Sequence, residues 1–412
     1  MAKIHGGQVL ARALRAIGVD TAFTLTGGHV VAVLDGLVQE GIRVVDLRHE
    51  QAVVHAAEAY ARLTGQLGLA VVTAGPGVTD SVTGVANALH SDTPLLVIGG
   101  RHFVRQELKG GLQEMDHPRL MSSVTKWAAT AWQTDRLADY VSTAARHAFA
   151  GRGGPVFIDV PMEVQFDMVE ESGITWPPPP DRGQIGGLEE KVLERALELM
   201  QNSARPVIFA SAVGPGPNRL HDLAEAWQAP AFLSGRARGS IPSGHPLLGV
   251  HTRSRTMADA DLVLALGVDW DFRAGYGEHL APEAVVIQVD RDQAKIGWNR
   301  PATLGMVADP SRVVEQLTGQ AGRLRPGRER TWADNFSAAE SATAAALRTE
   351  AMAAADSPVD PTRFSIEVGE FFGKESIVAV DGGDIVSTAA RWIQVSSPGH
   401  LLDPGPFGTL GT

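Results

Sequence analysis

Polar side chains that could do chemistry cluster at three points in the N-terminal part of the chain. The densest cluster is Arg48-His49-Glu50, which directly follows an apolar run, Val44 to Leu47, that is typical of a strand. Ligands of parallel α/β sheets bind beyond the carboxyl ends of the strands, so Glu50 stands where a working carboxylate would lie. The structural alternative is that Glu50 only complements the dipole at the start of a helix.

The second cluster, Thr73 to Asp80, also follows an apolar run and contains the turn Gly75-Pro76-Gly77. Glycines let the backbone approach a flat or anionic ligand closely. The turn lacks the third glycine of the dinucleotide fingerprint, as does the segment Gly214 to Asn218, which argues against a nicotinamide-dependent dehydrogenase. Alone, either segment could be a tight turn without a ligand.

The third cluster, Thr26-Gly27-Gly28-His29, again lies at the end of an apolar run. A histidine in such a place can act as an acid or a base near neutral pH. It can also be a helix cap or a packed polar group. His29 is therefore a further candidate for the chemistry, beside Glu50 and the glycine turn.

Apolar runs and helical patterns alternate over residues 1–165, and these elements must position the three clusters. The runs predict strands at residues 22–25, 42–47, 68–73, 94–98 and 155–160, with helices at 7–17, 30–37, 51–63 and 82–89. Such alternation is typical of β-α-β units with a parallel sheet. Residues 1–165 are therefore expected to form one complete α/β domain.

The rest of the chain repeats this alternation. Residues 166–186 hold four consecutive prolines, Pro177 to Pro180, and are expected to be a stiff extended linker. A second α/β domain is predicted at 187–320, with a helix at 188–200 and strands at 206–210, 261–266 and 284–289. Residues 321–357 are expected to form a helical connector. A third unit only begins within 358–412, with a helix from 361 to 372, a strand at 376–380 and a helix at 385–393.

Composition excludes several classes of protein. The chain has 412 residues, of which 44% are hydrophobic and 20% charged, which is an ordinary globular balance. It has no cysteine, so disulfides, cysteine-ligated metals and thiol nucleophiles are excluded. A net charge of −11 disfavours nucleic acid as a partner. No run approaches the ~20 apolar residues of a membrane span, and there is no secretory signal, so a cytoplasmic location is expected.

Read together, the motifs resemble the pyrimidine-binding domain of thiamine-diphosphate-dependent enzymes. The resemblance is to the group that contains acetolactate synthase, oxalyl-CoA decarboxylase, 2-hydroxyacyl-CoA lyase and benzaldehyde lyase. It is carried by the string from Arg48 to Gly65, followed by Thr73 to Gly77. Further matching segments cover the chain in order: 87–95, 112–116, 125–127, 235–249, 261–276, 380–384 and 407–411.

The resemblance implies roles for individual residues. Glu50 would face a ring nitrogen of the aminopyrimidine and promote formation of the reactive carbanion, whose chemistry belongs to the cofactor. His29 would be a proton shuttle, and Gln113 would reach the substrate. The other implied cofactor contacts are Gly28, Thr73, Gly75, Pro76, Gly77 and Asn87. Because the family shares each cofactor between two chains, a homodimer or homotetramer is implied.

Three residues bear on the substrate. Many relatives have an aromatic residue just before the Gln-Glu pair, where this chain has Leu112, and leucine would leave more space for a branched substrate. In the second domain, Arg255 could meet a phosphate and Asp290 a ribose, as in a site for ADP or for the nucleotide end of CoA. For both residues a surface or structural pairing is the alternative.

The resemblance also implies Mg²⁺, whose ligands we do not find. The family holds this ion with a Gly-Asp-Gly motif followed by an asparagine, and Mg²⁺ requires near-octahedral oxygen ligands. Asp381-Gly382-Gly383-Asp384 matches the wrong place in the family pattern. No metal ligand is therefore expected in this chain, and the motif is expected beyond Thr412.

The best prediction of function is a carbon–carbon lyase that cleaves a 2-hydroxyacyl-CoA to formyl-CoA and an aldehyde or ketone. Acetolactate synthase-like or benzaldehyde lyase-like ligation of small molecules is the alternative within the family. A non-catalytic binding or assembly protein that has lost the cofactor anchor is the alternative from another class.

Overall fold

A computed structural model of the chain describes residues 2–180, 186–213, 219–325, 329, 331–355, 357–373 and 375–412. The glycine-rich segment 214–218 lies outside the described residues. Contacts divide the chain into two units, of which one comprises Met1–Gly183 with Pro404–Thr412 and the other Gln184–Asp403. Each unit is built on a parallel sheet with helices, which confirms the predicted α/β class.

The sheet of the first unit has the strand order β3-β2-β4-β5-β7-β6 among the described residues, and every neighbouring pair is parallel. Its strands are β2 (Thr21–Leu25), β3 (Arg43–Asp46), β4 (Gly68–Val72), β5 (Leu95–Arg101), β6 (Trp127–Thr130) and β7 (Pro155–Pro161). The expected strands are all present. The half-buried β6 contains small residues, and its sequence has no clear apolar run, which is why it was not predicted.

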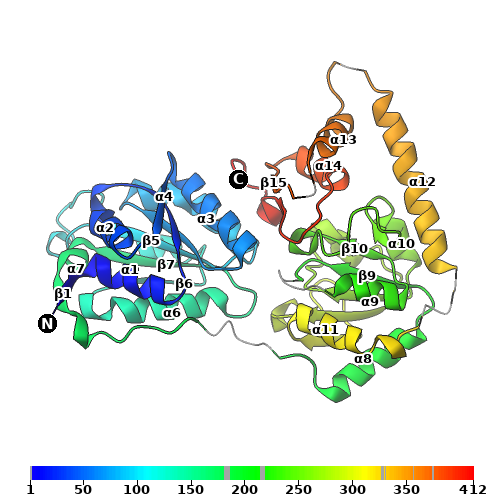
Figure 1. Cartoon of the computed structure of the whole chain (residues 1–412), viewed down its shortest axis with the longest axis horizontal. Coiled ribbons are helices and arrows are strands. Elements are labelled where there is room, and N and C mark those ends of the chain that lie inside the picture. The colour runs from blue at the N-terminus through cyan, green and yellow to red at the C-terminus, as the bar shows by residue number, and fades with distance from the viewer. Residues whose placement is uncertain are drawn as a thin grey trace. The chain divides into compact units, whose positions relative to one another are not determined.

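Helices cover both faces of this sheet (Figure 1). On one face lie α1 (Gly6–Ala16), α2 (Val31–Gln39) and α6 (Leu137–Phe149), and on the other lie α3 (Glu50–Thr64) and α4 (Pro76–His90). Side chains of a strand alternate between faces. Leu69 and Val71 of β4 accordingly pack with the first helix group, while Ala70 and Val72 pack with the second. Burial on both faces explains the continuous apolar runs in the sequence.

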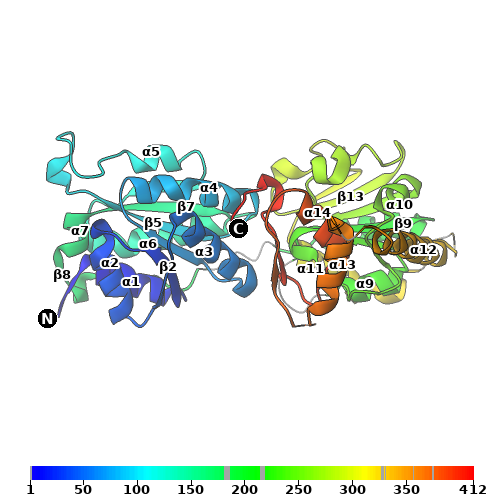
Figure 2. The same cartoon turned by 90° about the horizontal axis from the view of Figure 1, so that it is seen from above.

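Shorter elements complete the first unit. The strands β1 (Lys3–His5) and β8 (Met168–Glu170) form a separate antiparallel pair. Two short helices, α5 (His117–Met121) and α7 (Met162–Phe166), flank the ends of the sheet strands. The residues from Pro404 onward belong to this unit. Gln51 Nε2 donates to the carbonyl oxygen of Leu410 over 2.8 Å, so the C-terminal end lies beside α3 (Figure 2).

The second unit has a parallel sheet in the order β11-β10-β9-β12-β13-β14 among its described residues. The strands are β9 (Pro206–Ala210), β10 (Ala231–Leu233), β11 (Leu248–Gly249), β12 (Leu262–Leu266), β13 (Val285–Asp290) and β14 (Leu304–Val307). One core contains side chains of α8 (Glu190–Asn202), α9 (Leu220–Trp227) and α11 (Pro310–Gly319). The other contains side chains of α10 (Arg253–Asp259) and of α12 (Trp332–Met352).

The expected third β-α-β pattern has its helices at α13 (Pro361–Phe371) and α14 (Asp384–Trp392). Its strands are short: β15 (Val378–Ala379) pairs in parallel with β16 (Leu401–Leu402). A small core of its own surrounds them. Within the described residues, no helix is both long and apolar enough to cross a membrane.

Candidate active site

The three polar clusters come together because of the strand order. Strand β2 has β3 on one side and β4 on the other, so the direction of winding reverses between β2 and β4. Parallel α/β sheets bind ligands at such a switch point, outside the carboxyl ends of the strands. The clusters that contain His29, Glu50 and Gly75 follow β2, β3 and β4 in turn. All three clusters therefore lie on the same side of the sheet, at the carboxyl ends of its strands.

Glu50 is the first residue of α3 and is only 8% exposed. The helix begins here because His49 is its cap: the Nδ1 atom of His49 accepts a hydrogen bond from the backbone N–H of Gln51 over 3.1 Å. The carboxylate faces the glycine turn, since a Cβ atom on Gly77 would stand 3.5 Å from Glu50 Oε1. The carboxylate of Glu50 therefore borders the backbone of the turn.

The glycine turn is closely packed around Thr73. Gly75 has φ of 57° and ψ of −111°, a conformation that favours glycine, and Pro76 starts α4. A Cβ atom on Gly77 would lie 2.8 Å from Thr73 Cγ2, and one on Gly27 would lie 2.5 Å from Thr73 Cβ. Thr73 therefore joins the turns after β2 and β4. Its Oγ1 atom is buried and has no hydrogen-bond partner among the described residues.

Gln113 comes to the site from a distant loop. A Cβ atom on Gly75 would stand 2.8 Å from Gln113 Cβ, so this loop lies directly against the glycine turn. Gln113 has a positive φ of 59°, which turns the backbone sharply here. The preceding Leu112 is 73% exposed, in keeping with a surface position at the rim of the site.

His29 lies in a short helical turn, Gly28–Val30, and is 7% exposed. Its backbone carbonyl accepts a hydrogen bond from Gln165 Nε2 over 2.7 Å. Burial is the main cause that lowers the pKa of His29 below its ordinary value of 6.5, and the nearby His102 lowers it further. A side-chain hydrogen bond with Gln113 opposes this shift. The imidazole is therefore neutral at neutral pH, as a general base must be.

Not every predicted contact reaches this edge of the sheet. Asn87 is fully buried near the far end of α4, where its Nδ2 atom donates to Glu58 Oε2 over 2.9 Å. It holds α4 against α3 and does not line the turn. Gly28 and Pro76, in contrast, lie in the turns after β2 and β4, where both are exposed, and a Cβ atom on Gly28 would meet no described atom within 4 Å.

Sequence reasoning missed a buried polar network beneath the turn. His117 Nε2 accepts a hydrogen bond from the backbone N–H of Gly75 over 2.9 Å, and His117 Nδ1 lies 2.9 Å from Asp159 Oδ1. Asp159 also accepts from Arg101 Nη1 over 2.7 Å. A signal was present, because Arg101 and Asp159 are charged residues within the apolar runs of β5 and β7. Buried charges of this kind need partners.

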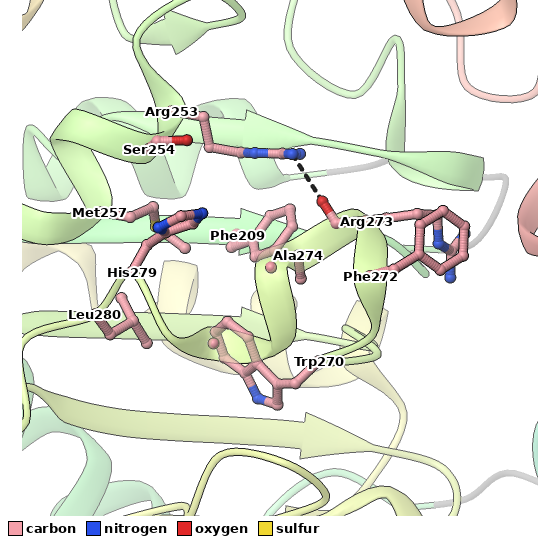
Figure 3. Close-up of a pocket in the computed structure, with 12 residues that line it drawn as sticks. Phe209, Arg253, Ser254, Met257, Trp270, Phe272, Arg273, Ala274, His279 and Leu280 are labelled. Atoms are coloured by element: carbon pink, nitrogen blue, oxygen red, sulfur yellow. Dashed lines mark hydrogen bonds between the residues drawn. The ribbon is translucent and has the colours of Figure 1, made fainter. Parts of the chain in front are cut away.

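The second unit has a pocket of about 120 Å³. Phe209 and Trp270 line it together with Arg253, whose Nη2 atom donates to the carbonyl oxygen of Arg273 over 2.7 Å (Figure 3). The predicted phosphate contact Arg255 is exposed and does not line the pocket. Arg253, two residues earlier on α10, lines the pocket instead, because helical geometry turns these two positions to different sides.

Asp290, the predicted ribose contact, is buried at the end of β13 and does not line this pocket. Its Oδ1 atom accepts a hydrogen bond from the backbone N–H of Asp292 over 2.9 Å. The carboxylate therefore stabilises the turn after the strand, which is the structural alternative stated for it.

Burial lowers the pKa of Arg253, and repulsion from Arg238 and Arg391 lowers it further. The Nη1 atom of Arg238 is buried and has no hydrogen-bond partner within the described part of the chain. Two carboxylates act in the opposite direction, since Asp271 raises the pKa of Arg253 and Asp403 raises that of Arg238.

Among the described residues, two clusters bring three potential metal ligands within 4.8 Å of one another. They are His221, Glu225 and His245, and His102, Glu107 and Glu114. Both include an imidazole, whereas Mg²⁺ prefers oxygen ligands only. In the second cluster Glu107 already binds Arg101 through both carboxylate oxygens, over 2.8 and 2.7 Å.

Comparison with known proteins identifies the family of the chain. Residues 4–120 match the family model of the thiamine pyrophosphate enzyme N-terminal TPP binding domain, and residues 193–317 match that of the central domain. The chain is 34% identical to a probable acetolactate synthase of Mycobacterium bovis, over 99% of this chain and 74% of that protein. It is 33% and 32% identical to 2-hydroxyacyl-CoA lyase 2 of Mus musculus and Homo sapiens, over 99% of this chain and 70% of each relative. The chain therefore belongs to the thiamine pyrophosphate enzymes, and the edge of the sheet that carries Glu50 and the glycine turn is its candidate active site.

Proposed function

We propose that this thiamine-pyrophosphate-dependent enzyme is a carbon–carbon lyase that cleaves a 2-hydroxyacyl-CoA to formyl-CoA and an aldehyde or ketone. The observation that carries this choice is the buried, neutral imidazole of His29 beside Gln113 at the candidate site. Cleavage of a 2-hydroxyacyl group turns a hydroxyl into a carbonyl, and the hydroxyl proton must go to a base.

The residues at the site fit the pyrimidine part of the cofactor. Thr73 Oγ1 is a buried polar atom that lacks a hydrogen-bond partner among the described residues, and a bound ring nitrogen or amino group could supply one. Because Gly77 has no side chain, Thr73 and the carboxylate of Glu50 can both lie close to the backbone of the turn. When bound, thiamine pyrophosphate supplies a carbon nucleophile and an electron sink.

Glu50 would orient and polarise the aminopyrimidine by holding a proton at one of its ring nitrogens. A buried carboxylate at a helix start is suited to this role, because α3 and the turn fix its position. His29 would take the proton of the substrate 2-hydroxyl as the bond between C1 and C2 breaks. That proton balances the one needed by the formyl carbon, so the cleavage requires no oxidant. Gln113 would orient His29 and the substrate carbonyl.

The pocket of the second unit would take the nucleotide end of the substrate, or ADP. Arg253 lines this pocket, with its guanidinium carbon 5.6 Å from the centre of the Phe209 ring. A phosphate would offset the repulsion that Arg253 experiences from Arg238. Arg255 and Asp290 are not part of this proposed site.

An acetolactate synthase-like ligation of two small 2-oxo acids is the second candidate function. It is supported by the relative of Mycobacterium bovis, whose identity to this chain is about as high as that of the lyases. Either reaction would use Mg²⁺ with the cofactor and sites shared between subunits, so we also propose that the active protein is a homodimer or homotetramer.

One experiment separates the two functions. The protein is supplied with thiamine pyrophosphate and Mg²⁺ and is incubated in parallel with pyruvate, with benzoin and with a 2-hydroxyacyl-CoA. Formation of formyl-CoA and an aldehyde from the third substrate alone is expected. Consumption of pyruvate without dependence on CoA would refute the lyase and favour the ligase.

A further inference from the structure

The imidazole of His117 is buried directly beneath the glycine turn. It is fully shielded from solvent, and its Nε2 atom accepts the backbone N–H of Gly75 over 2.9 Å. Gly75 precedes the first turn of α4 and, as a glycine, has no side chain of its own to cap that helix. The first N–H groups of a helix need partners from outside it. His117 therefore holds the peptide that enters the turn from outside the helix.

A second contact fixes the tautomer of His117. A neutral imidazole carries one N–H, and Nε2 accepts a hydrogen bond, so the proton is on Nδ1. That nitrogen donates to Asp159 Oδ1 over 2.9 Å. Asp159 is also fully buried, so the ring is held between a carboxylate and a backbone amide and cannot turn freely.

The carboxylate is anchored in turn. Asp159 Oδ2 accepts from Arg101 Nη1 over 2.7 Å and from Thr130 Oγ1 over 3.3 Å. Arg101 is bound by both carboxylate oxygens of Glu107. Adjacent strands β5 and β7 supply Arg101 and Asp159, so the network is rooted in the centre of the sheet.

We propose that His117 is a positioning residue for the cofactor: oriented by Asp159, it fixes the Gly75 peptide against which the aminopyrimidine binds. This inference rests on the proposed function. His117 itself touches neither cofactor nor substrate, and it acts through the backbone of Gly75. The glycine backbone has a wide choice of conformations, and the hydrogen bond to His117 selects the one with φ of 57°.

Three variants of the chain test this role. His117→Gln retains a side-chain oxygen that can accept from the Gly75 N–H, whereas His117→Leu has a similar size and no acceptor. Thr130→Val is the matched control, because it removes a bond to Asp159 on the side away from Gly75. The two readouts are amide hydrogen exchange at Gly75 without cofactor, and the Kd for thiamine pyrophosphate with Mg²⁺.

We expect His117→Leu to exchange the Gly75 amide at least about tenfold faster than wild type and to weaken cofactor binding by about tenfold, as loss of one buried hydrogen bond implies. In His117→Gln, the exchange rate of the Gly75 amide and the Kd for thiamine pyrophosphate should both be closer to wild type. Thr130→Val should resemble wild type in both measurements. Unchanged exchange and unchanged Kd in His117→Leu would overturn the proposal, as would a glutamine variant that is no better than leucine. If wild type itself binds no thiamine pyrophosphate, the proposed function fails, and the exchange rates still decide whether His117 holds Gly75.

Discussion

Glu50 and Gly77 lie next to each other at the candidate site. A Cβ atom on Gly77 would stand 3.5 Å from the Oε1 atom of Glu50, although the two residues follow different strands. The missing side chain of the glycine therefore lets Thr73 and the carboxylate lie close to the backbone of the turn. Because the site depends on both the charge of Glu50 and the missing side chain of Gly77, each can be tested separately.

Replacing Glu50 by glutamine should abolish most of the activity and leave the fold intact. The change removes the carboxylate that would polarise the aminopyrimidine, and loss of such a group costs about 10²–10⁴-fold in turnover. Steady-state kinetics and thermal unfolding measure the two effects. Glu190→Gln is the matched control, since Glu190 is also the first residue of a helix but is exposed in the other unit. Equal activity of the Glu50 variant and wild type would show that Glu50 only stabilises its helix.

Adding a methyl group at Gly77 should weaken cofactor binding through Thr73. The new Cβ atom would lie 2.8 Å from Thr73 Cγ2, and such overpacking costs about 1–3 kcal/mol. Thr73→Ser removes that methyl group, so the double variant should bind the cofactor better than Gly77→Ala alone. Calorimetric titration with thiamine pyrophosphate measures the difference. Strictly additive effects of the two changes would mean that the side chains do not meet.

The pH dependence should report the buried His29. Its folded pKa is lowered by burial, so the unfolded chain binds more protons just below pH 6.5. The contribution of His29 to stability is therefore fully present above pH 6.5 and is lost as the pH falls through its folded pKa. His29→Asn should reduce the loss of unfolding free energy between pH 6.5 and the folded pKa of His29. Denaturant titration at several pH values measures this loss.

The acidic limb of the pH profile of turnover tests His29 independently of stability. It should lie below pH 6.5 in wild type. Gln113→Met should move it to still lower pH, because the hydrogen bond that the His29 imidazole donates to the Gln113 side chain raises the pKa of His29. A shift toward higher pH in this variant would contradict the assignment of His29 as the base.

The selectivity for branched over unbranched substrates should depend on Leu112. Because this residue is exposed at the rim of the site, Leu112→Phe should add bulk without disturbing the core. We expect kcat/KM for branched relative to unbranched 2-hydroxyacyl substrates to fall by about tenfold. Leu108→Phe, in the same exposed loop, is the control. An unchanged ratio would exclude Leu112 as a determinant of specificity.

Two arginines on α10 provide a test of the nucleotide pocket. Arg253→Gln should raise the KM for an acyl-CoA substrate about tenfold with little change in kcat, because a charge-assisted bond is lost to a phosphate that takes no part in the reaction. Arg255→Gln should have no effect, since that side chain is exposed outside the pocket. Similar effects of both changes would point to general electrostatic attraction and not to a site.

Several features of this protein were determined by local sequence. The alternation of apolar runs with helical patterns predicted where strands β2 to β5 lie along the chain, because a strand buried on both faces must be apolar throughout. The clusters at Glu50, Gly75 and His29 could be found because helix caps and tight turns depend on neighbouring residues. The positions of these residues at the carboxyl ends of strands followed from the same local signals.

Only the tertiary structure decided which of these residues meet. Strand order brings the turns after β2, β3 and β4 together at the carboxyl ends of the strands. The packing of α4 on α3 directs Asn87 to Glu58 and away from the glycine turn. Asp159 lies 42 residues from His117 and 58 from Arg101 in the sequence, and no local pattern links them. A buried charge needs a partner, but its partner is chosen by which strands pair. The reactive groups can therefore be found in the sequence, whereas the network that holds them depends on which strands pair.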